Sequence, residues 1–139
     1  MSGLRWASVL EDNPLVLMDR VKGHDAANIT QASINAISFR VWRYASLADL
    51  KSGTNPTEVG TSASLTVANV VFDALQTADE AWTANGGDAA GYNFKTTIPK
   101  ARFATAGYHA VEILFDPAAA GEEDFRIAWG VRVDPVASE

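Results

Sequence analysis

The sequence predicts an all-β fold, an antiparallel β-sandwich, because apolar and polar residues alternate along its last third. Three strands are expected there in succession, over residues 92–98, 108–115 and 125–133. In the last strand every second residue is large and apolar: Phe125, Ile127, Trp129, Val131 and Val133. The residues between them are polar or small: Arg126, Ala128, Gly130 and Arg132. Since successive side chains of a strand point to opposite faces, this pattern indicates one buried and one solvent-facing side.

Residues 1–13 are expected to form a short arm that precedes a sandwich domain over residues 14–139. The segment contains Trp6 and Leu10, but its apolar residues fit no clear helix or strand period before Asn13-Pro14 interrupts it. Two interpretations remain open, a frayed terminus or an extension that packs Trp6 on a neighbouring subunit.

Two further strands are expected in the first half, over residues 15–21 and 36–44. The first is apolar on both faces at its start. In the second, Ile37, Phe39 and Val41 occupy one side. The opposite side holds Ser38, Arg40, Trp42 and Tyr44. A face that combines Arg, Trp and Tyr is either the rim of the sandwich or a contact surface.

The middle of the chain is less regular. Residues 46–56 are rich in Ser, Gly, Asn and Pro and predict a loop with one short helical turn at 47–50. Residues 58–65 predict an edge strand. Residues 67–75 fit either a short helix or a buried strand, and we favour a helical turn that leads into an extended stretch. Residues 76–91 then form a long loop, where binding often takes place.

The composition is that of one folded domain. The chain has 139 residues, of which 47% are hydrophobic and 20% charged. It contains no cysteine, so neither a disulfide nor a thiolate metal site can stabilise it. Its stability must come from packing, helped by any neighbouring subunits.

The net charge of −6, with only 11 Lys and Arg residues spread along the chain, argues against a nucleic-acid partner. A local basic patch of Arg20, Lys22, Arg40 and Arg43 is the one exception that the sequence allows. No stretch approaches the roughly 20 apolar residues that cross a bilayer, so no membrane partner is expected. Glu11 and Asp12 precede any apolar run of signal-peptide length, which predicts a chain made and kept, or assembled, in the cytoplasm.

The residues of catalysis are sparse, and we predict no catalytic, cofactor-binding or metal-binding residue and no enzyme. His24 and His109 are far apart in the sequence and are expected in a turn and on a sheet surface. The glycine-rich loop at 86–91 lacks the Lys-Ser/Thr pair of a phosphate loop. Two groups of acidic residues could supply calcium ligands, but we favour their interpretation as solvated charges in turns. They are Asp116 with Glu122, Glu123 and Asp124, and Asp73 with Asp79 and Glu80.

Trp82, Tyr92 and Phe94 form an aromatic set with two interpretations. Exposed rings beside carboxylates can stack on carbohydrate. The simpler interpretation, which we favour, is that Trp82 plugs the open end of the sandwich while Phe94 alternates into the core.

Several stretches together resemble the small immunoglobulin-like virion proteins of tailed bacteriophages. They are 36–42, 70–76, 91–94 with Ile98-Pro99, and 108–117 followed by Gly121 and Phe125. The resemblance spans about residues 15–134 and is a pattern of strands and turns without a catalytic motif, so it transfers no functional residue. The segment 1–13 departs from the pattern.

The resemblance implies an immunoglobulin-like β-sandwich that serves as a structural protein of the virion, assembled in the host cytoplasm. The leading expectation is a capsid decoration (cement) protein that binds the major capsid protein or other virion subunits as a homo-oligomer. A neck, head–tail or baseplate component is the alternative within the same particle. A carbohydrate-binding module that uses Trp82, Tyr92 and Trp42 is the alternative from another class.

Five residues are predicted to contact partners, because large aromatic side chains are enriched at the centres of interfaces. They are Trp6 and Leu10 in the arm, Trp42 and Tyr44 on the outer sheet face, and Trp82 in the long loop.

Overall fold

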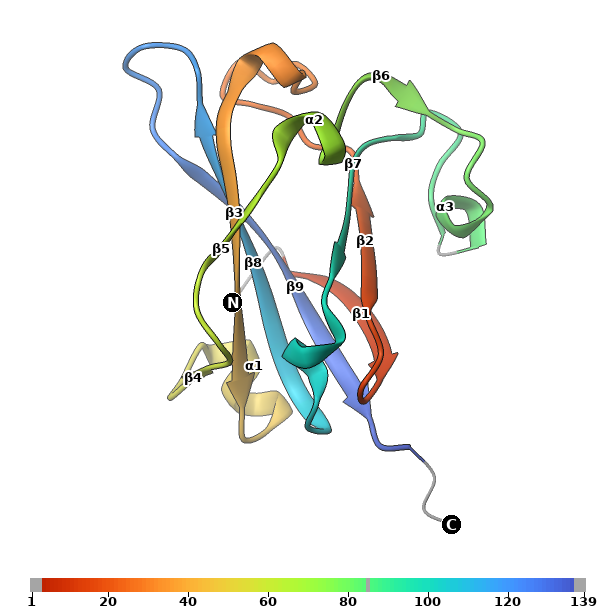
Figure 1. Cartoon of the computed structure of the whole chain (residues 1–139), viewed down its shortest axis with the longest axis vertical. Helices are drawn as coiled ribbons and strands as arrows, with labels where there is room; N and C mark the ends of the chain where they lie inside the picture. The colour runs from red at the N-terminus through yellow and green to blue at the C-terminus, as the bar shows by residue number, and fades with distance from the viewer. Residues whose placement is uncertain (1–3, 85, 137–139) are drawn as a thin grey trace.

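A computed structural model describes residues 4–84 and 86–136, and this part of the chain is mostly β-structure in two sheets (Figure 1). The six-stranded larger sheet has the order β1-β9-β8-β3-β4, with β5 also paired to β3. The smaller sheet has the order β2-β7-β6. The strands are β1 (Arg5–Leu10), β2 (Leu15–Asp19), β3 (Ile34–Tyr44), β4 (Thr57–Glu58), β5 (Ala63–Leu65), β6 (Val71–Gln76), β7 (Tyr92–Ile98), β8 (Gly107–Pro117) and β9 (Phe125–Asp134). The short helices are α1 (Leu47–Ser52), α2 (Val67–Val70) and α3 (Glu80–Ala84), with 3₁₀ turns η1 (Gln31–Ser33) and η2 (Lys100–Phe103).

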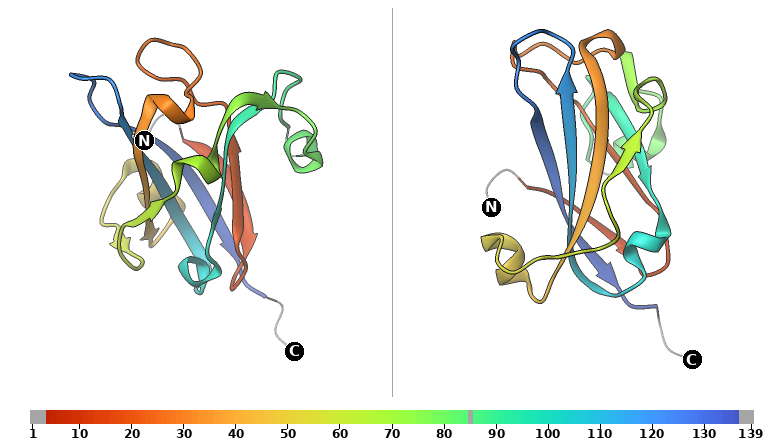
Figure 2. Two further views of the ribbon diagram at one scale, coloured as in Figure 1. Left: turned by 45° about the horizontal axis from the view of Figure 1, so that its top comes forward. Right: turned by 60° about the vertical axis from the view of Figure 1, so that its left-hand side comes forward.

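The two sheets form layers that share one hydrophobic core (Figure 2). The apolar residues that alternate along each long strand are buried, as the sequence predicted. From the larger sheet the core takes Ile37, Phe39, Val41, Val111, Ile113, Phe115, Ile127, Trp129, Val131 and Val133. From the smaller sheet it takes Leu15, Leu17, Val71, Phe94 and Ile98. Each such side chain stabilises the fold by about 1.5–3 kcal/mol on burial. The arrangement is consistent with the predicted β-sandwich.

The three strands predicted in the last third are present, but they are divided between the sheets. β8 and β9 pair antiparallel, with Val111 opposite Trp129. β7 lies in the other sheet, between β2 and β6. The chain crosses between the layers through η2, whose Phe103 is fully buried. Alternation reveals which face of a strand is buried, but not which strand lies next to it.

The segment expected as an unpaired arm is an edge strand over most of its length. β1 pairs with β9 from Arg5 opposite Trp129 to Leu10 opposite Asp134, and this pairing is parallel. The expectation of a purely antiparallel sandwich is therefore corrected at this edge. Ala7 and Val9 pack against the core, whereas Trp6 is exposed. The sequence shows no clear alternation here because Trp6 and Leu10, which face outward, are as apolar as the residues that face inward.

Glycine at position 130 makes room for the outward tryptophan of β1. A Cβ atom at Gly130 would lie 2.6 Å from the Trp6 ring, which is closer than van der Waals contact allows. The Trp6 ring thus lies directly over the β9 backbone, held in place although about half of it faces solvent.

The middle of the chain largely follows the predicted order. α1 begins after Ser46, whose hydroxyl accepts a hydrogen bond from the Asp49 amide at 3.1 Å, and ends at Gly53 in the left-handed conformation. The stretch 67–76 is a helical turn followed by a strand, as favoured. The edge strand expected over 58–65 is present as two short strands, β4 and β5, both paired with β3.

Candidate interaction groove

A groove of about 820 Å³ follows the edges of β1 and β2. Its wall includes three consecutive residues of β1, Trp6 to Ser8, and four of β2, Leu15 to Met18. Because consecutive side chains of a strand point to opposite faces, a hollow lined by consecutive residues follows the edge of the strand. Figure 1 shows β1 and β2 next to each other, joined by the turn at 11–14.

Both bordering edges lack a pairing strand within the described part of the chain. β1 pairs with β9 in the larger sheet, and β2 pairs with β7 in the smaller one. The two strands are not hydrogen-bonded partners of each other, although the Arg5 guanidinium and the Asp19 carboxylate form an ion pair between them. The groove is thus bounded by two open strand edges that belong to different sheets.

The lining is rich in exposed apolar side chains. Trp6 is 54% exposed and Val16 is 43% exposed. The remaining lining residues are Leu47 and Lys51 of α1, Tyr108, Trp129 and Arg132 of the larger sheet, and Trp82, Gly86 and Gly87 of the 77–91 loop. Lys51 and Arg132 are the charged members of this lining, and no carboxylate is among the described residues that form it.

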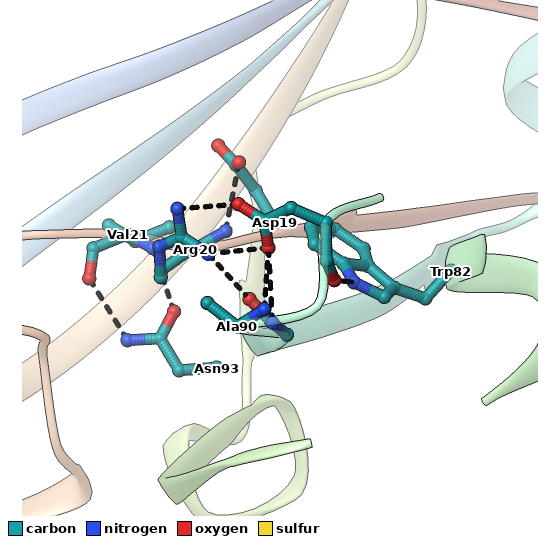
Figure 3. A network of polar contacts seen from close by, with 8 residues as sticks. Asp19, Arg20, Val21, Trp82, Ala90 and Asn93 are labelled. Atoms are coloured by element: carbon teal, nitrogen blue, oxygen red, sulfur yellow. Dashed lines mark hydrogen bonds and ion pairs between the residues drawn. The ribbon is translucent and has the colours of Figure 1, made fainter. Parts of the chain in front are cut away.

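One end of the 77–91 loop is fixed to the end of β2 by an arginine–carboxylate pair. The Arg20 guanidinium donates to both Asp88 carboxylate oxygens, at 2.7 and 2.8 Å (Figure 3). It also donates to the Gly91 carbonyl at 3.2 Å. The Asp88 carboxylate accepts hydrogen bonds from the Ala90 and Gly91 amides. Arg20 first, and these amides with it, lower the pKa of Asp88 to about 2.

A second carboxylate fixes the start of the loop to β7. The Asp79 carboxylate accepts from the Lys95 ammonium at 2.7 Å and from the Tyr92 hydroxyl at 3.4 Å. The hydrogen bond from Lys95 is the main cause of a lowered pKa at Asp79. The two carboxylates therefore hold both ends of a loop that forms one wall of the groove.

A buried amide organises the same region from inside. The Asn93 side chain is 1% exposed; its oxygen accepts from the Val21 amide at 2.7 Å, and its nitrogen donates to the Val21 carbonyl at 2.9 Å (Figure 3). The side chain of Asn93 thus bonds the backbone that follows β2, and extends the contact between β7 and this segment beyond the last paired residue of β2. Nothing in the sequence pattern singled this residue out.

Trp82 does not plug the end of the sandwich, which corrects the favoured interpretation. Its indole N–H donates to the Asp88 carbonyl at 2.8 Å, and its ring lies 5.5 Å from the Tyr92 ring. A Cβ atom at Gly87 would lie 2.3 Å from the Trp82 ring, so only glycine allows this approach. The Gly87 amide donates to the Trp82 carbonyl at 2.8 Å, which brings the ring against its own loop, and the ring remains half-buried in the groove wall.

Of the five predicted contact residues, Trp6 and Trp82 line the groove. Leu10 lies on β1 and is 52% exposed, but it is outside the groove lining. Trp42 is half-buried on the outer face of the larger sheet, with the Arg40 guanidinium 4.4 Å from its ring centre.

Tyr44 is buried, contrary to the expected position on an open outer face. It is 6% exposed and packs with Leu50 and Ala110, because α1 covers this end of the sheet. Burial, and then the negative charge of Glu112, raise its pKa above the ordinary value of 10.0. Neither Trp42 nor Tyr44 lines the groove.

The proposed sugar platform is not formed as a single surface. Trp82 and Tyr92 are in contact, but Tyr92 is only 5% exposed. Trp42 belongs to β3 of the other sheet. The three rings of the alternative carbohydrate-binding set thus lie in different environments.

The two histidines also lie apart. His24 is exposed in a turn, with its Nε2 atom 2.7 Å from the Glu123 carbonyl oxygen. His109 is buried beside Phe103, not on the sheet surface as expected, because it belongs to the inward set of β8. Burial lowers the pKa of His109 below its ordinary value of 6.5. In residues 4–84 and 86–136 no three acidic or histidine side chains are grouped to hold a metal ion.

The groove contains residues that the sequence did not single out as contacts, chiefly Val16, Lys51 and Arg132. A signal for Val16 was present, since the start of its strand is apolar on both faces. Lys51 and Arg132 come from segments that are far apart in the sequence, so no local sequence pattern links them. Of the cations that might have formed a basic patch, Arg20 pairs with Asp88 and Arg40 with Glu58.

Comparison of the sequence with known protein families and with curated proteins finds no match. None of the helices in the described part of the chain has the length and apolar character needed to span a bilayer.

Proposed function

We propose that this protein is a non-enzymatic structural protein of a tailed-phage virion, in which it decorates the capsid by binding the major capsid protein or another virion subunit. The observation that carries the proposal is the groove along two open strand edges, with Trp6 and Trp82 in its walls. Exposed edges and grouped apolar side chains are typical of surfaces that bind another chain.

The strand order supports the immunoglobulin-like part of the proposal. The order β3-β8-β9 corresponds to strands C, F and G of an immunoglobulin sandwich, and β2-β7-β6 corresponds to strands B, E and D. The first strand differs from the constant-type arrangement, in which it lies beside B. Here β1 pairs with β9, which leaves the edge of β2 open.

The physical properties suit a decoration role. A rigid sandwich presents the same surface in every copy, and repeated contacts of moderate area add up over a symmetric shell. A subunit that binds only the assembled shell stabilises it by mass action. The net charge of −6 disfavours contact with packaged nucleic acid.

The test is occupancy on purified particles produced with this chain. We expect mass spectrometry to detect the protein and electron microscopy to show symmetric copies on the capsid surface. The Trp6→Ala variant should lose occupancy, because Trp6 is exposed in the groove, and circular dichroism checks that the variant is folded. Arg126→Glu, on the same sheet but outside the groove, is the matched control and should bind normally.

Two other outcomes are possible on purified particles. Density at the neck or baseplate would replace the capsid position and keep the virion role. Absence of the protein from all particles, together with a strictly monomeric chain in solution, would contradict the proposal.

A further inference from the structure

We propose that the groove between β1 and β2 binds an extended segment of a partner protein, which pairs with the open edge of β2 as an added strand and directs a carboxylate toward Arg132. This inference deepens the proposed function and rests on its binding role. It does not require the partner to be a capsid protein.

The backbone of β2 is accessible along the groove. Leu15 to Met18 line the groove as consecutive residues, so the groove gives access to the edge of β2 and not only to one face. That edge has no partner strand among the described residues, because β2 pairs with β7 on its other side. An extended peptide can therefore satisfy the open amide and carbonyl groups, as in other cases of strand addition.

The lining combines apolar and polar side chains, which favours a peptide with alternating residue types. Trp6 and Tyr108 lie toward the larger sheet, and Trp82 lies in the loop beyond β2. An added strand places successive side chains on opposite sides, so one set can cover the exposed Trp6 and Val16. Burial of such rings supplies the affinity that backbone hydrogen bonds alone do not.

The charged side chains of the lining favour an acidic peptide. The described lining contains Lys51 and Arg132 and no Asp or Glu, although the whole chain has a net charge of −6. Arg132 contacts Asp134 at 2.9 Å, but both side chains are well exposed, and such a pair contributes little. The guanidinium can therefore exchange this contact for a carboxylate of a bound peptide.

The same charges disfavour a second copy of this chain as the occupant. Within the described residues, the sheet edges that another copy could offer are those of β1, β2, β6 and the short strands β4 and β5. β1 has no carboxylate in its sequence Arg5–Leu10. The carboxylates of the other edges are already engaged, since Asp19 pairs with Arg5, Asp73 accepts from the Gln31 amide, and Glu58 pairs with Arg40. A different protein with an acidic, apolar extended segment fits the groove better.

The experiment is a selection from a display library of random peptides of about eight residues, within the usual length of a strand, against the full chain. We expect enriched peptides to alternate apolar and polar residues and to contain Asp or Glu. The best of them is then synthesised, and its dissociation constant is measured by titration calorimetry. A copy with every second backbone amide methylated tests the strand pairing, since methylation removes the donors.

Three protein variants locate the binding site. Arg132→Glu should weaken binding roughly tenfold, equivalent to about 1.4 kcal/mol, because it places like charges together. Trp6→Ala should weaken it at least as much. Arg126→Glu is the matched control, since Arg126 and Arg132 lie on β9 with side chains 62% and 61% exposed, and only Arg132 lines the groove. Circular dichroism confirms that each variant is folded.

The inference is overturned if no peptide is enriched, if backbone methylation leaves the affinity unchanged, or if Arg126→Glu weakens binding as much as Arg132→Glu. Self-association that Trp6→Ala abolishes, without peptide binding, would overturn it in favour of a second copy. Occupancy on particles with no peptide binding would remove this inference alone. Peptide binding with absence from particles would remove only the virion role.

Discussion

The two edges of the larger sheet differ in how they are protected. At one edge, β3 is covered by the short strands β4 and β5, and Arg102 from η2 donates to the Val59 carbonyl at 2.7 Å between them. At the other edge, the six-residue β1 presents Trp6 and Leu10 to solvent. Short, interrupted edge strands resist pairing with other chains, whereas a longer apolar edge invites it. The difference identifies the β1 side as the one suited to a partner.

The largest expected effect comes from deletion of residues 1–13, which removes β1 from the open edge. If this segment were a dispensable arm, stability would be unchanged. Because Ala7 and Val9 pack on the core and β1 covers the edge of β9, we expect the free energy of unfolding to fall by about 3–5 kcal/mol. Urea denaturation followed by circular dichroism measures the change. An unaltered midpoint would show that β1 contributes nothing to the fold.

A smaller effect is expected from Gly130→Val, which pushes the Trp6 ring away from β9. The added Cβ would meet that ring at 2.6 Å, so Trp6 must move, at a cost of about 1–3 kcal/mol typical of overpacking. The matched control is Ala128→Val, on the same strand and the same outward face. Chemical denaturation should show a loss for Gly130→Val that exceeds the loss for the control. Equal losses would mean that Trp6 is not held over Gly130.

The smallest effect is local and depends on pH. The pKa of Asp88 is about 2 in the folded protein and has an ordinary value of 3.8. Its stabilising contribution is therefore present above about pH 4 and is lost as the pH falls toward 2. We expect the protection of amides in the described part of the 77–91 loop, measured as the exchange rate relative to the intrinsic rate at each pH, to fall over this range, because one wall of the groove opens. In Asp88→Asn the protection should already be lower at neutral pH, and its further loss on acidification should be smaller.

A second acid effect must be separated from this one. Burial holds the pKa of His109 below 6.5, so the unfolded chain takes up the proton first and global stability begins to fall below about pH 6.5. His109→Leu removes this dependence, whereas Asp88→Asn leaves it in place. If exchange in the loop followed the histidine range instead, the Arg20–Asp88 pair would not be what holds the loop.

The candidate site was predicted only in part, and the reason differs between its residues. Trp6 and Trp82, which line the groove, were predicted as contacts because large aromatic residues in irregular segments are visible in a sequence. The burial of Tyr44 was not predicted, since α1 packs on the outer face of β3 through Leu50, a contact between separate elements. Arg132 was visible only as a polar member of an alternating strand, and its place in the same groove lining as Lys51 depends on how β9 and α1 are arranged.

By itself, the sequence determined most of the strand segments, though not β1, and which face of each long strand is buried. This information is local, because the alternation of β3, β8 and β9 follows from neighbouring residues and the geometry of an extended chain. Only the tertiary structure decided the pairing: that β1 joins β9 in parallel, that β7 lies in the smaller sheet, and that β2 keeps an open edge. Any strand can supply the same backbone hydrogen bonds, so the choice of neighbour depends on packing between residues far apart in the chain.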